Sequence, residues 1–281
     1  MTKLSWGRRY LMCPPTHFEV AYAINPWMGG TVDRDLAMSQ WETLVAALRM
    51  AGADVQIIDG VAGLPDMVFT ANAGVIDGQT FIAGAMRHDE RTPETAHFRR
   101  WAAAGGLRIV HLSSGAVLEG LGDCMPLGDW LVSGYGARSN RIAHADLTRL
   151  TGRPVISVEL ADLRWYHVDL TLCPLDDRRA IVFPDAYDPL GARRVLDLIP
   201  EPLVLTPQEA ATFTANSVVV NSTVIMPSCP PRVGAQLEAW GFDVVEVDVS
   251  EFVKAGGAVR CLTLPLDTVL AQQDARMEVV A

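Results

Sequence analysis

Cys261 and His167 are the two residues whose types could carry nucleophilic catalysis. A cysteine thiolate attacks an electrophilic carbon, while a neighbouring imidazole accepts or stabilises the thiol proton and later protonates the leaving group. Three acidic residues, Glu119, Asp123 and Asp169, lie in similar short polar motifs. Acyl transfer needs hydrogen-bond donors for an oxyanion, whereas a carboxylate-rich pocket suits a cationic electrophile such as a guanidinium. These residue types predict the cleavage of a carbon–nitrogen bond.

Cys261 has a structural alternative, because a cysteine in an apolar strand is more often a small core residue. Two features favour catalysis. Gly256 and Gly257 precede it and allow the close backbone approach that a substrate loop needs. Cys261 also occupies a repeat position that Asn or Asp holds elsewhere in the chain. We interpret the other cysteines, Cys124, Cys173 and Cys229 among them, as structural.

His167 could be an ordinary core histidine, as His111 and His144 illustrate. Asp169, however, lies two residues further on, and residues two apart in a strand share one face. We therefore expect His167 to act as an acid and base and Asp169 to bind a cation in the same pocket. The segment from Glu119 to Asp123 could by itself be only a turn with an Asx motif.

The polar motifs recur along the chain. The tetrapeptide Phe69–Asn72 returns as Phe213–Asn216, and the segment 73–84 after the first copy matches the segment 217–228 after the second. Successive motif residues are 47, 51, 46, 47 and 45 positions apart, a period of about 47. They are Asn25, Asn72, Asp123, Asp169, Asn216 and Cys261. Each matching segment reads as a hairpin with its tip at Asp77-Gly78 or Asn221-Ser222.

Every unit also contains a helical stretch that feeds a short strand. The expected helices span residues 34–51, 93–104, 143–151, 190–198 and 232–240, and the expected strands 55–58, 107–110, 155–158, 203–205 and 244–247. Units that cannot bury their own faces must pack on one another, and five of them suit a closed ring with the strands inside. The sequence thus predicts an α/β fold, a five-bladed pseudo-symmetric α/β propeller of ββαβ repeats, as one domain over residues 1–281. An open doubly wound sheet would need a Gly-rich loop after the first strand, and residues 12–16 do not form one.

Composition restricts the function further. The 281 residues are 49% hydrophobic and 20% charged, with a formal net charge of −10, so no basic face for nucleic acid is expected. The five cysteines form no CxxC pair and no Cys/His cluster at zinc spacing, which predicts no metal and a cytoplasmic protein. No apolar run reaches the ~18 residues of a membrane span. Most acidic surfaces serve solubility, so the charge alone does not identify a cationic partner. Self-association into a homo-oligomer stays open.

Taken together, the motifs resemble the guanidine-modifying superfamily with the pentein fold, which includes dimethylarginine dimethylaminohydrolases, arginine deiminases, amidinotransferases and arginine dihydrolases. The Glu-Gly-Leu-Gly-Asp segment 119–123 resembles that family's Glu-Gly-Gly-Asp motif. Residues 134–140 resemble its Gly-Leu-Ser-x-Arg-Thr-Asn motif. The pair His167-x-Asp169 and the late Gly-Gly-x-x-x-Cys261 complete the likeness, which spans nearly the whole chain.

The resemblance implies a role for each motif residue. Cys261 would attack the guanidinium carbon to give a covalent S-alkylthiouronium, His167 would protonate the departing amine and then activate water, and Glu119 would orient His167. No cofactor or metal is implied, and the partner is a small-molecule substrate. The substrate-binding residues would be Asp169 with Asp66 for the guanidinium and Arg138 with Arg87 for the amino-acid carboxylate, together with Asn72, Asn25 and Asp123.

Asn72 departs from the pattern of the methylarginine hydrolases and deiminases, which usually have Asp at this position of the Phe-x-x-Asp motif. Asn72 and the segment around Asn25 resemble the arginine dihydrolase branch, in which arginine becomes ornithine, ammonia and carbon dioxide. A neutral amide both donates and accepts hydrogen bonds and so can bind the uncharged urea of a citrulline intermediate. The alternatives are a dimethylarginine dimethylaminohydrolase and, more remotely, a non-catalytic binding protein of pentein fold.

Overall fold

Each repeat unit folds into a three-stranded sheet, and five such sheets make up the computed structural model, which describes residues 4–270. In every sheet the first two strands form an antiparallel pair, and the third pairs in parallel with the second. The strands are β3 (Gly74–Asp77), β4 (Thr80–Ala83) and β5 (Arg108–Val110); β6 (Cys124–Leu127), β7 (Trp130–Tyr135) and β8 (Val155–Glu159); β9 (Leu172–Pro174), β10 (Arg179–Val182) and β11 (Glu201–Val204); β12 (Val218–Val220), β13 (Thr223–Met226) and β14 (Asp243–Glu246); β15 (Leu264–Pro265), β1 (Arg9–Met12) and β2 (Asp54–Ile57).

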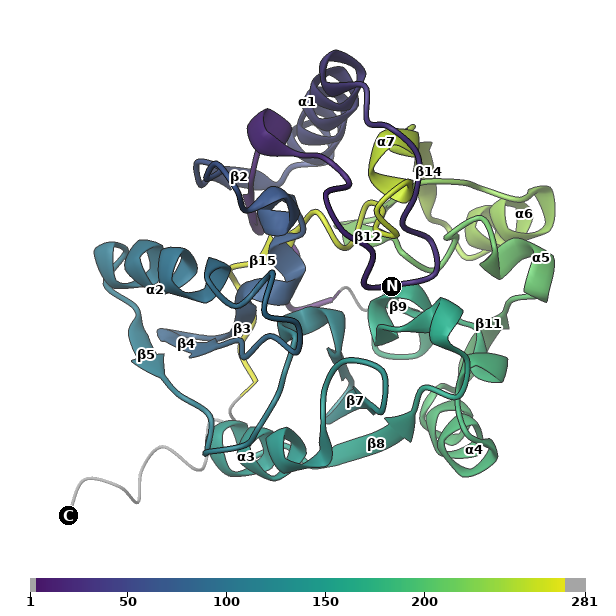
Figure 1. Cartoon of the computed structure of the whole chain (residues 1–281). Helices are drawn as coiled ribbons and strands as arrows, with labels where there is room; N and C mark the ends of the chain where they lie inside the picture. Colours follow the sequence, from purple (N-terminus) through teal and green to yellow (C-terminus); the bar gives the residue numbers. More distant parts are fainter. Residues whose placement is uncertain (1–3, 271–281) are drawn as a thin grey trace.

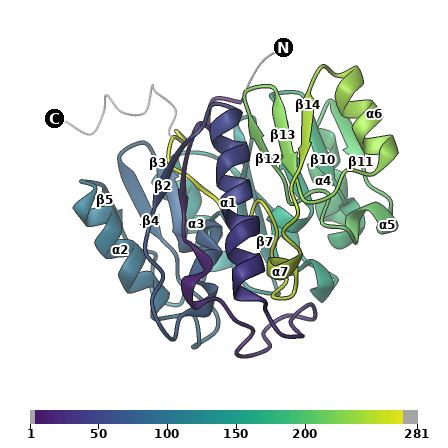
Figure 2. The same ribbon diagram turned by 90° about the horizontal axis from the view of Figure 1, so that it is seen from above.

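A helix joins the second and third strands of each sheet, because a parallel pair needs a crossover connection. These helices are α2 (Glu94–Ala104), α3 (Arg141–Thr151), α4 (Pro189–Leu198), α6 (Pro231–Ala239) and α1 (Arg34–Met50). They lie around the outside of the molecule, with the sheets nearer its centre (Figure 1; Figure 2). Their bounds confirm the predicted helices to within two residues at either end. Two further helices are short, α5 (Pro207–Ala210) and α7 (Ser250–Val253).

Helix ends follow from local sequence. Asp33 caps α1 by accepting hydrogen bonds from the backbone of Asp35 and Leu36. Asn140 caps α3 in the same way, and Gly152 ends that helix in the left-handed conformation, φ 71°. Asn140 is the last residue of the Gly134–Asn140 motif, so that motif positions α3 as well as the site.

The two hairpins predicted from the matching segments are confirmed as β3–β4 and β12–β13. Their tips need a residue in the left-handed region, which Gly and Asn enter at low cost. Gly78 has φ 56° and Asn221 has φ 57°. The turn chemistry of the sequence therefore sets the strand register.

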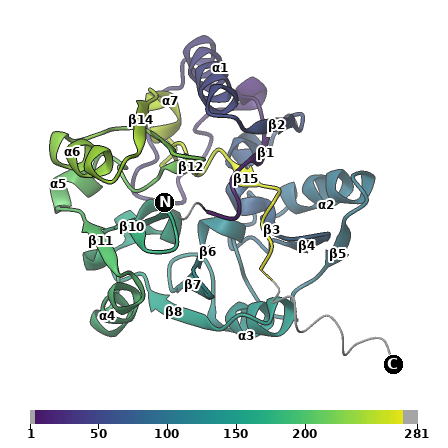
Figure 3. The same ribbon diagram turned by 180° about the vertical axis from the view of Figure 1, so that it is seen from behind.

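The fifth sheet is assembled from both parts of the chain. β15 pairs antiparallel with β1, so that Leu11 lies opposite Leu264 (Figure 3). Asn25 consequently does not precede the first strand of any sheet; it lies between β1 and α1, and its use as a repeat marker was wrong. The remaining markers, Asn72, Asp123, Asp169, Asn216 and Cys261, do lie just ahead of first strands.

Hydrogen bonds join these five turns into a ring. The Ala71 N–H donates to Cys261 O (3.1 Å), and Asn72 Nδ2 donates to Glu119 O (3.2 Å). The Val168 N–H donates to Asp123 Oδ1 (3.4 Å). Asn216 closes the ring, because its Nδ2 donates to Asp169 O (3.0 Å) and its Oδ1 accepts from the Arg260 N–H (3.0 Å). Three of the turns are 3₁₀ helices: η3 (Thr70–Ala73), η4 (Gly120–Gly122) and η6 (Val168–Leu170). The motifs therefore converge at one end of the ring of sheets.

Apolar side chains fill the space between sheets and helices. Phe81 on β4 and Phe98 on α2, for example, are fully buried in one cluster. Replacing such a side chain by Ala typically costs about 3–5 kcal/mol. No helix within residues 4–270 is both long and apolar enough to cross a membrane.

Candidate active site

A cavity of about 250 Å³, part of it open to solvent, lies where the five turns meet. Six of the residues predicted from the sequence line it: Asn25, Asp66, Asn72, Arg138, His167 and Cys261. Glu119, Asp123 and Asp169 are fully buried directly behind them. Arg87 is not among the residues that line the cavity, and its side chain is exposed to solvent.

Cys261 is held between an amide and a carboxylate. Its Sγ accepts a hydrogen bond from Asn216 Nδ2 (3.2 Å) and donates one to Asp169 Oδ2 (3.3 Å). Burial and the Asp169 charge raise the pKa of the Cys261 thiol well above its usual value. The thiol is therefore protonated while the cavity is empty, and a cation bound beside it would favour the thiolate.

His167 is enclosed by two carboxylates. Its Nε2 lies 3.3 Å from Glu119 Oε2. Its Nδ1 lies 3.1 Å from Asp123 Oδ1, off the line of the ring N–H, so that contact is ionic rather than a directed hydrogen bond. Burial lowers the pKa of His167, but Asp123 and Glu119 more than offset it and raise the pKa to about 9. The imidazole is thus charged near neutral pH and can donate a proton.

Glu119 contacts two cationic side chains, Arg138 and His167. Burial would raise its pKa, yet Arg138 and His167 hold the pKa well below the usual value. Arg138 Nη1 donates to Oε2 at 2.8 Å, and the backbone N–H of Arg87 donates to Oε1 at 3.1 Å. Arg87 therefore contacts Glu119 through its backbone, and the binding of a substrate carboxylate by its guanidinium stays a prediction. Arg138 also donates a second hydrogen bond, from Nη2 to Ile24 O at 3.0 Å.

Asn72 is fixed by a residue that the motifs did not identify. Arg91 Nη1 donates to Asn72 Oδ1 at 2.9 Å, while Asn72 Nδ2 lies 3.3 Å from His167 Nε2. Arg91 is buried and pairs with Glu94 through two hydrogen bonds of 3.0 and 2.9 Å. Its Nε also lies 3.8 Å from Asp66 Oδ2.

Asp66 lies beside that cation and lines the cavity. Burial raises its pKa, whereas Arg91 and the hydroxyl of Tyr22 next to it lower the pKa. An ionised carboxylate at the wall of a cavity can attract a cationic ligand.

The loop that carries Asn25 covers one side of the cavity. Asn25 Nδ2 donates to Ala255 O (3.0 Å), and its Oδ1 accepts from the Trp27 N–H (2.9 Å). Trp27 packs against Phe213 with ring centroids 4.7 Å apart. Asn25 thus fastens this loop to the segment before Cys261.

Three cavity or neighbouring residues were missed as site residues: Arg91, Tyr166 and Asn216. Asn216 was marked as a repeat residue, which was a usable signal. Tyr166 precedes His167, and its ring lies 4.7 Å from the Arg138 guanidinium carbon. Nothing in the sequence separates Arg91 from Arg87 four positions earlier.

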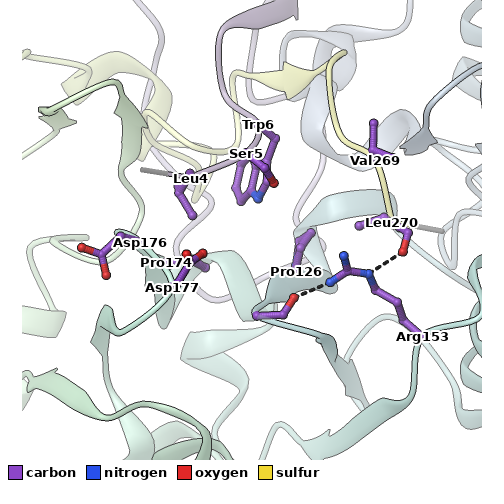
Figure 4. A pocket seen from close by; sticks show the side chains of 11 residues that line it. Leu4, Ser5, Trp6, Pro126, Arg153, Pro174, Asp176, Asp177, Val269 and Leu270 are labelled. Atoms are coloured by element: carbon purple, nitrogen blue, oxygen red, sulfur yellow. Dashed lines mark hydrogen bonds between the residues drawn. The ribbon is translucent and has the colours of Figure 1, made fainter. Parts of the chain in front are cut away.

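A second pocket lies at the other end of the ring of sheets, near the β6–β7 and β9–β10 turns (Figure 4). Strand β6 runs from Cys124, next to the Asp123 turn, to Leu127, next to the tip at Gly128. Arg153 in this pocket donates hydrogen bonds to Leu270 O and Gly128 O. Because the pocket contains none of the Cys, His and Glu residues discussed above, it is not the candidate active site.

A family model described as N,N dimethylarginine dimethylhydrolase, eukaryotic, matches residues 29–268. The chain belongs to this family.

One relative of this chain is the N(G),N(G)-dimethylarginine dimethylaminohydrolase of Mycobacterium tuberculosis. The two are 40% identical over 261 residues, which cover 92% of this chain and 86% of the relative. Relatives with the same fold have also been solved as crystal structures.

Two of those structures are of the N-terminal domain of ArgZ, an arginine dihydrolase of cyanobacteria. One is a cysteine-to-serine variant bound to substrate. It is 35% identical to this chain with a TM-score of 0.89, and the match covers 93% of this chain and 99% of that domain. An asparagine-to-serine variant covalently bound to a reaction intermediate has a TM-score of 0.90 and 35% identity, with 94% and 99% covered. The mixed α/β fold of five three-stranded sheets agrees with these structures.

Proposed function

We propose that the protein is a cysteine-dependent arginine dihydrolase that converts arginine and two water molecules into ornithine, two ammonia molecules and carbon dioxide. Hydrolysis of an arginine-type guanidino carbon–nitrogen bond is what the family relatives have in common. The observation that carries the dihydrolase assignment is Asn72, a neutral amide that lies 3.3 Å from His167.

The first hydrolysis uses Cys261, His167 and Asp169. Asp169 binds the guanidinium, and the added positive charge beside Cys261 favours the thiolate, whose proton leaves the site. Sulfur attacks the guanidinium carbon, His167 protonates one nitrogen, and that nitrogen leaves as ammonia. Water then adds to the carbon of the S-alkylthiouronium and gives a proton to His167. The carbon–sulfur bond then breaks and the hydroxyl proton passes to solvent, which releases neutral citrulline and restores the thiolate.

The second hydrolysis repeats the attack on the uncharged ureido carbon of citrulline. A second ammonia leaves with a proton from His167 and a thiocarbamate remains on Cys261. Water hydrolyses it to the carbamate of ornithine, which loses carbon dioxide. A carboxylate at position 72 would repel the oxyanion that forms on the ureido oxygen, whereas the Asn72 amide can donate to it.

The remaining residues bind and orient the substrate. Asp66 supports Asp169 in binding the guanidinium, and Asp123 holds His167 in its charged form. Arg138 and Arg87 provide the cations for the amino-acid carboxylate, and Asn25 holds the loop at one side of the cavity. We infer that the five sheets are the blades of a pentein propeller and that the chain is a single domain; residues 1–3 and 271–281 of that domain lie outside the described residues.

A dimethylarginine dimethylaminohydrolase is the second candidate, favoured by the family model and by the M. tuberculosis relative. It would use the same nucleophile and acid but would stop at citrulline.

None of the five cysteines forms a disulfide, which supports the cytoplasmic location expected from the sequence.

Incubation of the purified protein with arginine and, separately, with asymmetric dimethylarginine tests both candidates. Products are identified by mass spectrometry together with an ammonia assay. We expect ornithine and two equivalents of ammonia from arginine. Citrulline and dimethylamine from the methylated substrate, with arginine inert, would replace this assignment by the second candidate. No product from either compound would favour a non-catalytic binding protein.

A further inference from the structure

Arg260, the residue before Cys261, is a buried cation that pairs with no carboxylate among the described residues. Of the three buried arginines in residues 4–270, Arg91 and Arg138 pair with carboxylates. Arg260 is 2% exposed, and its Nε and Nη1 have no hydrogen-bond partner among the described residues. Its Nη2 contacts only the sulfur of Met125, at 3.9 Å. A buried charge without compensation is strongly unfavourable, so a counter-charge is needed.

The immediate surroundings of Arg260 do not supply one. Its guanidinium carbon lies 5.2 Å from the ring centroid of Trp6, a cation–π distance. A small cavity beside it is lined by Cys173, Val218 and Val219, with no carboxylate. The compensating charge must therefore act from beyond contact distance, which a low-dielectric interior allows.

Asp169 is the complementary buried anion, because its Oδ2 accepts a hydrogen bond from Cys261, the residue that follows Arg260. It is fully buried, forms no ion pair within the described part of the chain, and has no hydrogen-bond partner on Oδ1. Burial raises its pKa to about 6, and the charges of His167 and Arg260 oppose that rise. The titratable groups that face Asp169 are those of His167, Tyr166, Asp123, Cys261 and Arg260.

Three of these groups cannot balance Asp169. Asp123 is itself an anion, Cys261 donates a neutral thiol hydrogen bond, and the neutral hydroxyl of Tyr166 donates to Gly256 O. His167 is a cation, but it already lies between Glu119 and Asp123. Arg260 is thus the one cation near Asp169, among the described residues, that no other carboxylate contacts.

We propose that the Arg260 guanidinium is the internal counter-charge that keeps the Asp169 carboxylate ionised while the cavity is empty. Asp169 is then ready to bind the guanidinium of the substrate. Arg260 touches no reacting atom and acts only through Asp169. This inference rests on the proposed function, because it assumes that Asp169 binds a cationic substrate.

The pH dependence of kcat/KM for arginine tests the proposal in Arg260→Met and Arg260→Lys, from about pH 5 to about pH 9. Loss of the cation lets the pKa of Asp169 rise, so the acid limb of Arg260→Met moves up by about one pH unit. Well above that limb its kcat/KM stays within about threefold of the wild type, a difference of under 1 kcal/mol. Arg260→Lys keeps the positive charge, so its acid limb should move by less than half of the shift seen in Arg260→Met. Arg193→Met removes the same charge from an exposed position and leaves the profile unchanged.

A purely structural role for Arg260 predicts a different result. The neutral variant would then lose the same factor of activity at every pH, and Arg260→Lys would be no better than Arg260→Met. Either observation overturns the proposal. If Arg260→Met does not fold, Arg260→Gln is the neutral variant. If neither folds, the acid limb of Arg260→Lys decides, because a shift of a full unit with the charge retained contradicts the proposal.

Calorimetric binding to the Cys261→Ser variant separates this inference from the proposed function. Near pH 6, adding Arg260→Met should weaken the binding of cationic arginine about fivefold, because a rise of one unit in the pKa of Asp169 lowers its ionised fraction by about that factor, and should leave neutral citrulline unaffected. Equal weakening of both ligands overturns the role of Arg260. A wild-type enzyme that hydrolyses no arginine, together with a Cys261→Ser variant that binds neither ligand, overturns the proposed function instead.

Discussion

Arg91 donates a hydrogen bond from Nη1 to Oδ1 of Asn72 at 2.9 Å, and this contact decides which side of the amide faces His167. With the oxygen committed to Arg91, the Nδ2 of Asn72 must point into the cavity, toward Glu119 O and His167 Nε2. The orientation of a buried amide is thus determined by a guanidinium from outside the motif. A hydrogen-bond donor is what the oxygen of a bound urea requires.

Asn72→Asp should shift the product of arginine hydrolysis from ornithine toward citrulline, by about tenfold in their ratio, a change of about 1.4 kcal/mol in partitioning. The new carboxylate would still pair with Arg91 but would repel the ureido oxyanion. Product ratios are measured by mass spectrometry over complete time courses. Asn221→Asp makes the same chemical change at a hairpin tip and should leave the ratio unaltered. An unchanged ornithine yield in Asn72→Asp would remove the proposed role of this amide.

Cys261→Ser should reduce kcat by about 10³-fold or more, because a serine hydroxyl is a far poorer nucleophile toward a guanidinium. The variant should still bind arginine and show an unfolding transition close to that of the wild type. Cys229→Ser changes a half-buried cysteine outside the cavity and should retain full activity. Substantial turnover by Cys261→Ser would contradict the assignment of the nucleophile.

The pH profile of kcat/KM should be bell-shaped, with limbs near the pKa values of Asp169, about 6, and His167, about 9. Below the first value Asp169 is protonated and loses its attraction for the guanidinium. Above the second value His167 is neutral and cannot protonate the leaving nitrogen.

Glu119→Gln should move the alkaline limb to lower pH, because the variant removes one of the two carboxylates that raise the pKa of His167. The value of kcat should fall by about 10²-fold, the usual contribution of a positioned general acid. Glu238→Gln alters an exposed residue and serves as the control. An alkaline limb that stays in place in Glu119→Gln would show that Glu119 does not set the charge of His167.

Gly122→Ala should damage activity through packing alone. An added Cβ would overlap Nδ2 of Asn72 and would lie 3.4 Å from His167 Cγ. Such overpacking costs about 1–3 kcal/mol, which thermal or urea unfolding can measure. Gly29→Ala is the matched control, because no atom lies within 4 Å of its added Cβ. Equal stability and activity of the two variants would show that Asn72 adapts without loss.

Much of the fold could be predicted because its signals are local. The helix that ends at Met50, the hairpin tip at Gly78 and the matching tip at Asn221 follow from periodicity, capping and turn chemistry. The residue types that motifs place at the start of a sheet, such as Cys261 and His167, were predicted for the same reason. Regular spacing is enough to predict their convergence at one end of the ring.

Three features depended on the tertiary structure. Arg87 and Arg91 lie four residues apart with the same side chain, and only the path of the chain after β4 sends Arg91 inward and leaves Arg87 exposed. Asn25 shares the repeat spacing but precedes no first strand, because the fifth sheet pairs β15 with β1 across the length of the chain. Arg260 reads as an ordinary surface charge, yet packing buries it.

The sequence by itself determined the repeat, its hairpins and helices, and the residue types available for attack on a guanidinium, because these depend on neighbours within about one unit of the chain. The tertiary structure alone decided which distant charges meet, since ion pairing between His167 and Glu119, or its absence at Arg260, depends on distances between side chains and on the exclusion of water.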